Sequence, residues 1–141
     1  MDSISPEHRS WNMAQVKGKD TRPELKVRSW LFKNGFRYRK NDSRFPGKPD
    51  VVLPKYRTVI FVHGCFWHRH PGCKNTRMPK SNVEFWETKF SRNVENDKRH
   101  VRELEAMGWR VIVIWECELG SKTFEETMQR VRDELEAIQD E

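Results

Sequence analysis

Residues 47–73, GKPDVVLPKYRTVIFVHGCFWHRHPGC, join two short apolar runs to a dense group of cysteines and histidines. The runs Val51–Leu53 and Thr58–Val62 are rich in β-branched side chains, and the polar residues between them begin with proline. This composition is typical of two strands and a turn, so we predict a β-hairpin. Asp50 then stands at the start of the first strand, one strand away from His63.

A helix is predicted before the hairpin. Thr21 suits an N-cap, Pro23 suits the first turn, and Glu24 lies where a capping box needs it. Asn34-Gly35 ends the helix. A first strand is expected over Phe36–Arg39. The apolar face of the helix is expected to consist of Leu25, Arg28, Leu31 and Phe32.

Two more helices and a strand are predicted after residues 64–80, a segment without periodicity that we expect to be irregular. A long helix, capped by Ser81 or Asn82 with Glu84 reaching back, should run to Met107. Residues 109–115 form a nearly continuous apolar run, typical of a strand buried on both faces. The final helix, capped by Thr123, should direct inward Phe124, Met128, Val131, Leu135 and Ile138.

This order of elements predicts an α/β single domain, with a central mixed β-sheet flanked by helices on both faces. The long helix and the strand after it form a crossover unit, so that strand should run parallel to one hairpin strand. At 141 residues the chain has room for one such domain. We expect residues 22–141 to form it, and residues 1–21 to be a mobile arm.

Basic side chains predominate outside the C-terminal segment. The net charge is +6, but residues 118–141 hold eight acidic and three basic side chains, which leaves 24 basic and 13 acidic ones elsewhere. Such a field attracts polyanions, most often nucleic acid, although a merely soluble basic protein is the alternative. The apolar runs are too short to cross a membrane and no signal region is visible, so we expect an intracellular protein without a membrane partner.

The three cysteines indicate a metal site, because an odd number in a reducing compartment argues against disulfides. Cys65, His70 and Cys73 have the spacing and softness of zinc ligands, and Cys117 can complete a structural Cys₃His tetrahedron. His63 and His68 are alternative ligands. Three reduced core cysteines without metal are the alternative to the whole site.

Asp50 has two interpretations. It either caps the turn of Gly47 and Pro49, which is the commoner role of such an aspartate, or holds a cation against a substrate phosphate. The neighbouring strand favours the cation, because it ends at His63, where a second metal ligand would lie.

Several motifs together resemble those of a known nuclease group. Gly47-Lys48-Pro49-Asp50, the following hairpin and the helix carrying Glu24 are similar to the core of the PD-(D/E)XK superfamily, the restriction-endonuclease-like fold. A longer combination, from about Ser10 to Leu119, resembles the very-short-patch repair (Vsr) endonucleases. It comprises Val59–Trp67 with His68, Glu84-Phe85-Trp86, Asn93-Val94-Glu95, Asp97 and Gly108-Trp109-Arg110-Val111 to Cys117. Phe61-Val62-His63 replaces the second acid and lysine of the superfamily, and a similar replacement marks the Vsr group.

The resemblance implies a DNA endonuclease that nicks one strand on the 5′ side of the thymine in a T:G mismatch and so initiates very short patch repair. Asp50 would hold a catalytic Mg²⁺ together with the main-chain carbonyl of Val62, since this hard cation takes oxygen ligands. His68 is the candidate general base. The outer shell would contain Glu24 and His63.

Asp97 would orient a histidine, although an ordinary ion pair with a helix neighbour explains it equally well. The resemblance also favours His70 as the fourth ligand of a structural Zn²⁺.

The resemblance further implies a set of DNA contacts. Phe66 and Trp67 would enter the base stack beside the mismatch with Trp86, while Met13 would insert from the other groove. Lys89 and Asn93 lie four residues apart on one helix face and would contact the mismatched bases. From the sequence alone, Trp86 also fits the apolar stripe of the long helix, and Lys89 and Asn93 also fit a solvent-exposed face of that helix. Plausible phosphate contacts are Arg22, Lys48, Arg69 and Lys74.

The expected protein is therefore a magnesium-dependent mismatch endonuclease with a structural zinc, acting on double-stranded DNA in the bacterial cytoplasm, near the nucleoid. We expect a monomer, with other mismatch-repair proteins as further partners. The alternatives are a nuclease of the same fold with another specificity, and a zinc-stabilised DNA-binding module without catalysis.

Overall fold

The structure, a computed structural model, describes residues 21–74 and 76–139. The expected N-terminal arm, including Met13, therefore lies outside the described residues except for Thr21, and so does the side chain of Ile138. None of the described helices has the length and hydropathy needed to cross a membrane.

A four-stranded mixed sheet forms the centre of the domain, in the order β1-β2-β3-β4. β1 (Arg39–Lys40), β2 (Val51–Leu53) and β3 (Thr58–His63) are antiparallel neighbours, and β4 (Arg110–Trp115) runs parallel to β3. A short 3-10 helix, η1 (Pro54–Tyr56), connects β2 to β3. The predicted hairpin and the predicted parallel pairing are both confirmed.

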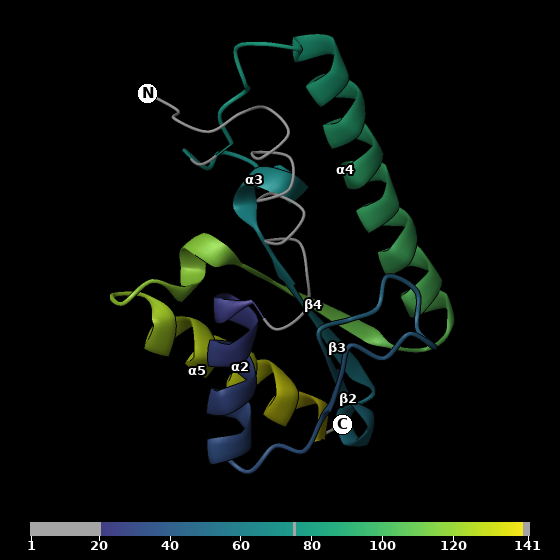
Figure 1. Cartoon of the computed structure of the whole chain (residues 1–141). Helices are drawn as coiled ribbons and strands as arrows, with labels where there is room; N and C mark the ends of the chain where they lie inside the picture. The colour runs from purple at the N-terminus through teal and green to yellow at the C-terminus, as the bar shows by residue number, and fades with distance from the viewer. Residues whose placement is uncertain (1–20, 75, 140–141) are drawn as a thin grey trace.

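Helices cover both faces of this sheet (Figure 1). α2 (Arg22–Lys33) and α5 (Phe124–Gln139) pack on one face, and the long α4 (Val83–Ala106) packs on the other. The one-turn helix α3 (Cys65–His68) follows β3, and the 3-10 helix η2 (Glu116–Leu119) follows β4. The α/β single-domain fold class is therefore confirmed.

Successive side chains of a strand point to opposite faces of the sheet, so the core has a smaller and a larger portion, one on each face. The α4 side is small, and its buried members are Val52, Val59, Phe61 and Leu104. The α2 and α5 side is larger, and its fully buried members include Val27, Leu31, Ile60, Ile114, Met128, Val131 and Leu135. The inward face predicted for the final helix is thus confirmed as far as Leu135.

β4 is less buried than predicted. Ile112 and Ile114 are buried against the larger core, but Val111 and Val113 are only half-buried on the α4 side. The prediction of burial on both faces is wrong because the α4 side holds too few large side chains to cover that face.

The buried face of α2 also differs from the prediction. Arg28 and Leu31 are buried as predicted, but Leu25 and Phe32 are 51% and 59% exposed, and Val27, which was not predicted, is fully buried. Thr21 makes no capping hydrogen bond through its side chain, so the predicted capping box is wrong. Glu24 is buried instead, and its carboxylate lies 3.6 Å from the guanidinium of Arg28.

The first strand is shorter and later than predicted. β1 covers only Arg39 and Lys40, while Phe36 is buried with its ring centre 6.5 Å from that of Trp30 and 5.6 Å from that of Tyr56. Packing of the Phe36 ring into the larger core keeps this residue out of the strand.

Two local expectations around α4 are also wrong. Residues 65–68 form the single turn α3 within a segment expected to be irregular. Asn82 is the N-cap residue of α4, as one of the two alternatives predicted, but it is left-handed and no side chain, including that of Glu84, makes a capping bond there. The end of α4 before Met107 and Gly108 is as predicted.

Leu31→Ala and Leu25→Ala form a matched pair for the orientation of α2. We expect Leu31→Ala to lower the free energy of unfolding by about 2–5 kcal/mol, because it leaves a cavity in the larger core. Leu25→Ala should change it by less than about 0.5 kcal/mol, because that side chain is largely in solvent. Urea denaturation followed by circular dichroism measures both, and equal losses would contradict the observed face.

Candidate active site

Chemically active side chains meet at one edge of the sheet, where β3 and β4 end and the antiparallel β2 begins. Asp50 immediately precedes β2, and its Oδ2 atom accepts a hydrogen bond of 2.6 Å from the main-chain N–H of Val62. Asp50 thus bridges two strands of the hairpin. The role of the Val62 carbonyl as a metal ligand stays a prediction.

α2 brings a second carboxylate and a guanidinium to Asp50. Glu24 and Arg28 are only 7% and 3% exposed, and Arg28 Nη1 lies 3.6 Å from Glu24 Oε2 and 3.5 Å from the main-chain oxygen of Asp50. Burial above all, together with Glu24, raises the pKa of the Asp50 carboxyl to about 7, although the Val62 N–H and Arg28 both act to lower it. A cation bound beside Asp50 and Glu24 would therefore displace a proton from these two carboxyl groups.

A histidine pair lies at the end of β3 beside α4. His68 Nδ1 lies 2.6 Å from Asp97 Oδ2, and the ring centres of His63 and His68 are 3.9 Å apart with planes 5° from parallel. Asp97 is thus directed at a histidine on another element. Burial, followed by the charge of His68, lowers the pKa of His63 to about 3, so His63 remains neutral at physiological pH. Its Nδ1 atom has no hydrogen-bond partner among the described residues.

Cys65, His70, Cys73 and Cys117 form a separate cluster in which the possible ligand atoms all lie within 4.8 Å of one another. His70 Nδ1 is 3.7 Å from Cys65 Sγ and 3.4 Å from Cys117 Sγ. A tetrahedral zinc ion has Zn–S bonds of about 2.3 Å and Zn–N bonds of about 2.0–2.1 Å, which gives nitrogen-to-sulfur edges of about 3.6 Å. The four residues therefore have the geometry to hold a metal ion.

A second possible metal-binding group among the described residues is His63, His68 and Asp97. Asp50 belongs to neither group, which is compatible with a Mg²⁺ ion that keeps most of its waters. Burial raises the pKa of Cys65 to about 12 and also raises that of Cys117, so the metal-free thiols stay protonated. His70 stacks on Trp115 at 4.3 Å, which fixes its ring at the end of β4.

Four aromatic rings from α3 and α4 form one cluster above this edge. Phe66 lies 5.2 Å from Phe90 and 6.2 Å from Trp86, and Trp67 lies 5.9 Å from Trp86. Phe66, Trp67 and Trp86 are half-buried, and Phe90 is buried. Phe66 and Trp67, the two aromatic residues of α3, are therefore partly covered by α4.

Lys89 and Asn93 line a groove of about 690 Å³ along the N-terminal half of α4. The Asn93 amide donates a hydrogen bond of 3.1 Å to the main-chain oxygen of Trp67. Asn93 therefore ties α4 to α3, in addition to any contact that it makes with a ligand in the groove.

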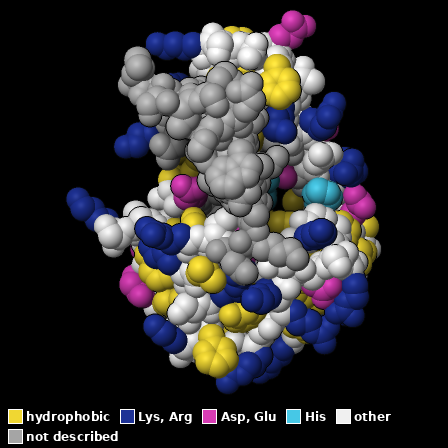
Figure 2. All heavy atoms as spheres, in the orientation of Figure 1, with side chains coloured by type: hydrophobic (Ala, Val, Ile, Leu, Met, Phe, Trp, Pro, Cys, Tyr) yellow, Lys and Arg dark blue, Asp and Glu magenta, His cyan; other side chains and the backbone are white. Residues whose placement is uncertain are grey.

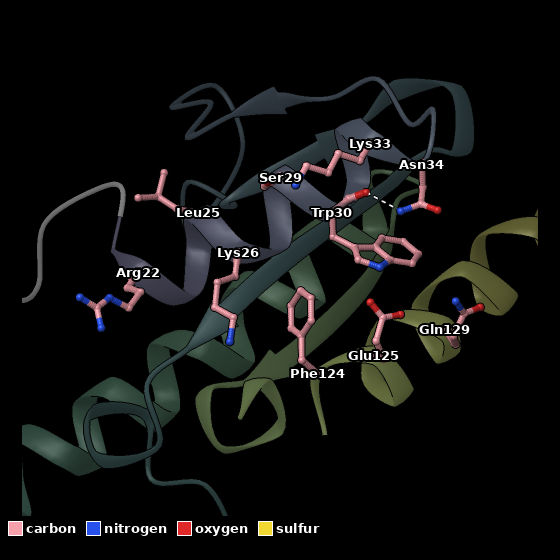
Figure 3. Close-up of a pocket in the computed structure, with 10 residues that line it drawn as sticks. All are labelled: Arg22, Leu25, Lys26, Ser29, Trp30, Lys33, Asn34, Phe124, Glu125 and Gln129. Carbon is pink, nitrogen blue, oxygen red and sulfur yellow. Dashed lines mark hydrogen bonds between the residues drawn. The ribbon is translucent and has the colours of Figure 1, made fainter. Parts of the chain in front are cut away.

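Another groove, of about 660 Å³, lies between α2 and α5, away from the clusters described above (Figure 3). Lys26 points across it toward Phe124, lies 4.8 Å from the centre of that ring and donates to the main-chain oxygen of Leu119. Lysine and arginine side chains are spread over the face shown in Figure 2, as the net charge of +6 leads one to expect.

Comparisons with known proteins identify the family. The model of the family described as DNA mismatch endonuclease Vsr matches residues 1–75. The DNA mismatch endonuclease Vsr of Escherichia coli K12 is 44% identical over 81% of this chain and 72% of its own length. The chain belongs to the Vsr family.

Other relatives carry names of the same enzyme class. The type II nicking enzyme V.NmeAIP of Neisseria meningitidis serogroup A is 48% identical over 97% of this chain and 99% of its own length. The type II nicking enzyme V.XorIIP of Xanthomonas oryzae pv. oryzae is 49% identical over 84% of this chain and 87% of its own length. Membership of the Vsr family makes the chain a DNA endonuclease.

Two residues near the Vsr site were not found by sequence reasoning. Arg28 was assigned to an apolar face, yet its guanidinium lies beside the Glu24 carboxylate and the main-chain oxygen of Asp50. His100 packs against Gly47, where an added Cβ would lie 2.8 Å from its Nδ1 atom, and its charge lowers the pKa of His63. The sequence could have indicated His100, because it lies three residues after Asp97 and so on the same face of the predicted long helix.

Asp50→Asn tests the buried carboxyl. The folded-state pKa of about 7 exceeds the ordinary value of 3.8, so the stability contributed by this group is complete below pH 3.8 and is lost as the pH rises through 7. The neutral amide avoids that loss. Without Mg²⁺, we expect the variant to be more stable than wild type above pH 7 by up to about 4 kcal/mol, with a smaller gain at pH 5.

Urea unfolding of both proteins between pH 5 and 8 measures this difference, and comparison with wild type cancels the titration of His63. A stability difference that does not change with pH would contradict the raised pKa.

Proposed function

We propose that the protein is a Mg²⁺-dependent endonuclease that nicks one strand on the 5′ side of the thymine in a T:G mismatch. The observation that carries the proposal is the position of Asp50, held by the Val62 N–H beside Glu24 and next to the stacked pair of His63 and His68. The E. coli relative is named a DNA mismatch endonuclease, which supports this choice among nuclease activities.

Asp50 and the carbonyl of Val62 are the proposed protein ligands for the cation, with Glu24 orienting its waters. Two nearby carboxylates and few other oxygen ligands suit a hard ion that dehydrates reluctantly. When bound, Mg²⁺ would neutralise charge on the phosphate oxygens and on the leaving oxygen. Arg28 balances the charge of the carboxylates from within the protein.

His68 is the proposed general base. Because its Nδ1 atom faces Asp97, the second ring nitrogen, Nε2, is left to accept a proton from the attacking water. The Asp97 carboxylate orients the ring and stabilises the imidazolium that results. His63 stays neutral beneath that ring and so adds no second positive charge.

Phe66, Trp67 and Trp86 are proposed to enter the base stack beside the mismatch, and Met13 to insert from the other groove. Opening a base step costs a few kcal/mol, and the cost is least at a mispair, so this insertion favours mismatched DNA. Lys89 and Asn93 would contact the mismatched bases from their groove.

The Cys65, His70, Cys73 and Cys117 cluster is proposed to hold one structural zinc ion. This would join the segment after β3 to the end of β4. We further propose that residues 1–21 clamp DNA, that residues 22–141 form the endonuclease domain, and that a monomer acts in the bacterial cytoplasm, where other mismatch-repair proteins are candidate partners.

Nicking of a T:G duplex with Mg²⁺ tests the catalytic assignment. We expect Asp50→Ala to lower the single-turnover rate by at least about 10³-fold, since the cation contributes several kcal/mol to the transition state. Asp42→Ala is the control, because that carboxylate pairs with Arg44, a side chain largely in solvent. The assignment is wrong if wild type fails to nick T:G duplexes or if Asp50→Ala retains its rate. Duplexes with each of the other mismatches measure the specificity.

Metal analysis of the purified protein tests the zinc assignment. We expect about one zinc per chain, and its loss in His70→Gln. His63→Gln is a matched control that should keep the metal, because His63 lies outside the cysteine cluster. A content well below one equivalent, or loss of zinc in His63→Gln alone, would refute the Cys₃His ligand set.

A further inference from the structure

Arg69 lies between the aromatic cluster and the cysteine cluster, and its guanidinium contacts other groups of the protein. Its Nη1 atom donates to the Phe66 main-chain oxygen at 3.4 Å, and its Nη2 atom donates to that of Thr76 at 2.5 Å. Its guanidinium carbon lies 4.0 Å from the centre of the Phe90 ring and 5.7 Å from that of Phe66. The expectation that Arg69 contacts a DNA phosphate does not fit this orientation.

The guanidinium has no carboxylate partner among the described residues. Its desolvation, which lowers the pKa of Arg69, is offset by two carbonyl oxygens and by the faces of two rings. A lysine could not reproduce this arrangement, because an ammonium group lacks the planar fork that reaches two acceptors while stacking on a ring.

Thr76 extends this connection to the cysteine cluster. Its hydroxyl donates to the main-chain oxygen of Cys73 at 2.6 Å, and its main-chain N–H donates to the same oxygen at 3.2 Å. A continuous path of hydrogen bonds therefore runs from Cys73 through Thr76 to Arg69 and on to Phe66. Phe90, on α4, contacts the same guanidinium from the other side.

α3 needs such support, because a helix of four residues has little stability of its own. Side chains that separate adjacent base pairs must withstand a restoring free energy of a few kcal/mol. If α3 could move, the restacking of the bases would push Phe66 and Trp67 back toward the protein.

We propose that Arg69 is the positioning residue of the aromatic wedge, which consists of Phe66, Trp67 and Trp86. It fixes α3 against Phe90 and the cysteine-bearing loop, so that the wedge remains directed at the DNA stack. This inference rests on the proposed insertion of the wedge, and it assigns Arg69 no contact with DNA or with the reacting atoms.

Arg69→Lys keeps the charge and removes the fork, and Arg99→Lys is the matched control on the exposed face of α4. Both variants and wild type are bound at saturation, without Mg²⁺, to a T:G duplex that carries 2-aminopurine beside the mismatch. Unstacking of this base raises its fluorescence. We expect Arg69→Lys to give less than about half the wild-type increase and Arg99→Lys to match wild type, with zinc content unchanged in both.

Nicking of two substrates separates positioning from general structural damage. On the intact T:G duplex, Arg69→Lys should lose at least about tenfold in kcat/KM. On the same duplex with an abasic site next to the mismatch, where the step is already open, the loss should be within about threefold. Arg69→Gln, which keeps donors but not charge, should show the same pattern.

Equal losses on the two substrates, or a wild-type fluorescence increase in Arg69→Lys, would overturn the role of Arg69. If wild type nicks neither duplex, the proposed activity fails, and the fluorescence comparison still decides about Arg69. If wild type produces no fluorescence increase, insertion itself is absent and the inference is overturned with it.

Discussion

The hydrogen bond between the Val62 N–H and the Asp50 carboxylate is the constraint on which the site depends. It joins the start of β2 to the end of β3, and so fixes a carboxylate at the edge of the sheet where β4 also ends. Everything assigned to catalysis lies around this edge. The main-chain N–H that Asp50 occupies would otherwise be a donor without a partner at the end of a strand.

Concentrating carboxylates and histidines at this edge costs stability, and the fold offsets that cost in specific places. Arg28 is buried beside Glu24 and the main chain of Asp50, and the neutral form of His63 is enforced by burial beneath His68. Gly47, at a φ of 76°, lets the loop before Asp50 approach His100 closely. A buried polar atom without a partner among the described residues, such as His63 Nδ1, is common where a site must be ready for a ligand.

The cysteine cluster and the aromatic cluster beside this site consist of different residues. The cysteines and His70 join the segment after β3 to the end of β4, and the aromatic rings of α3 rest on α4. Arg69 connects the two. Ring packing, and the metal ion proposed for the cysteine cluster, would hold this loop, since a segment with almost no regular secondary structure has few main-chain bonds to stabilise it.

Local patterns in the sequence predict the hairpin, the long helix, the parallel strand and the members of the cysteine cluster, because apolar periodicity and ligand spacing can be recognised in short segments. The roles of Phe66, Trp67 and Trp86 came from the resemblance to the Vsr family. The tertiary structure decided that Glu24 and Val27, in place of Leu25 and Phe32, join Leu31 on the buried face of α2, because Glu24 and Arg28 there meet Asp50. It also decided that Asp97 meets His68, a contact across 29 residues, and that Arg69 turns inward. Contacts between distant segments follow from packing, which no single stretch of sequence contains.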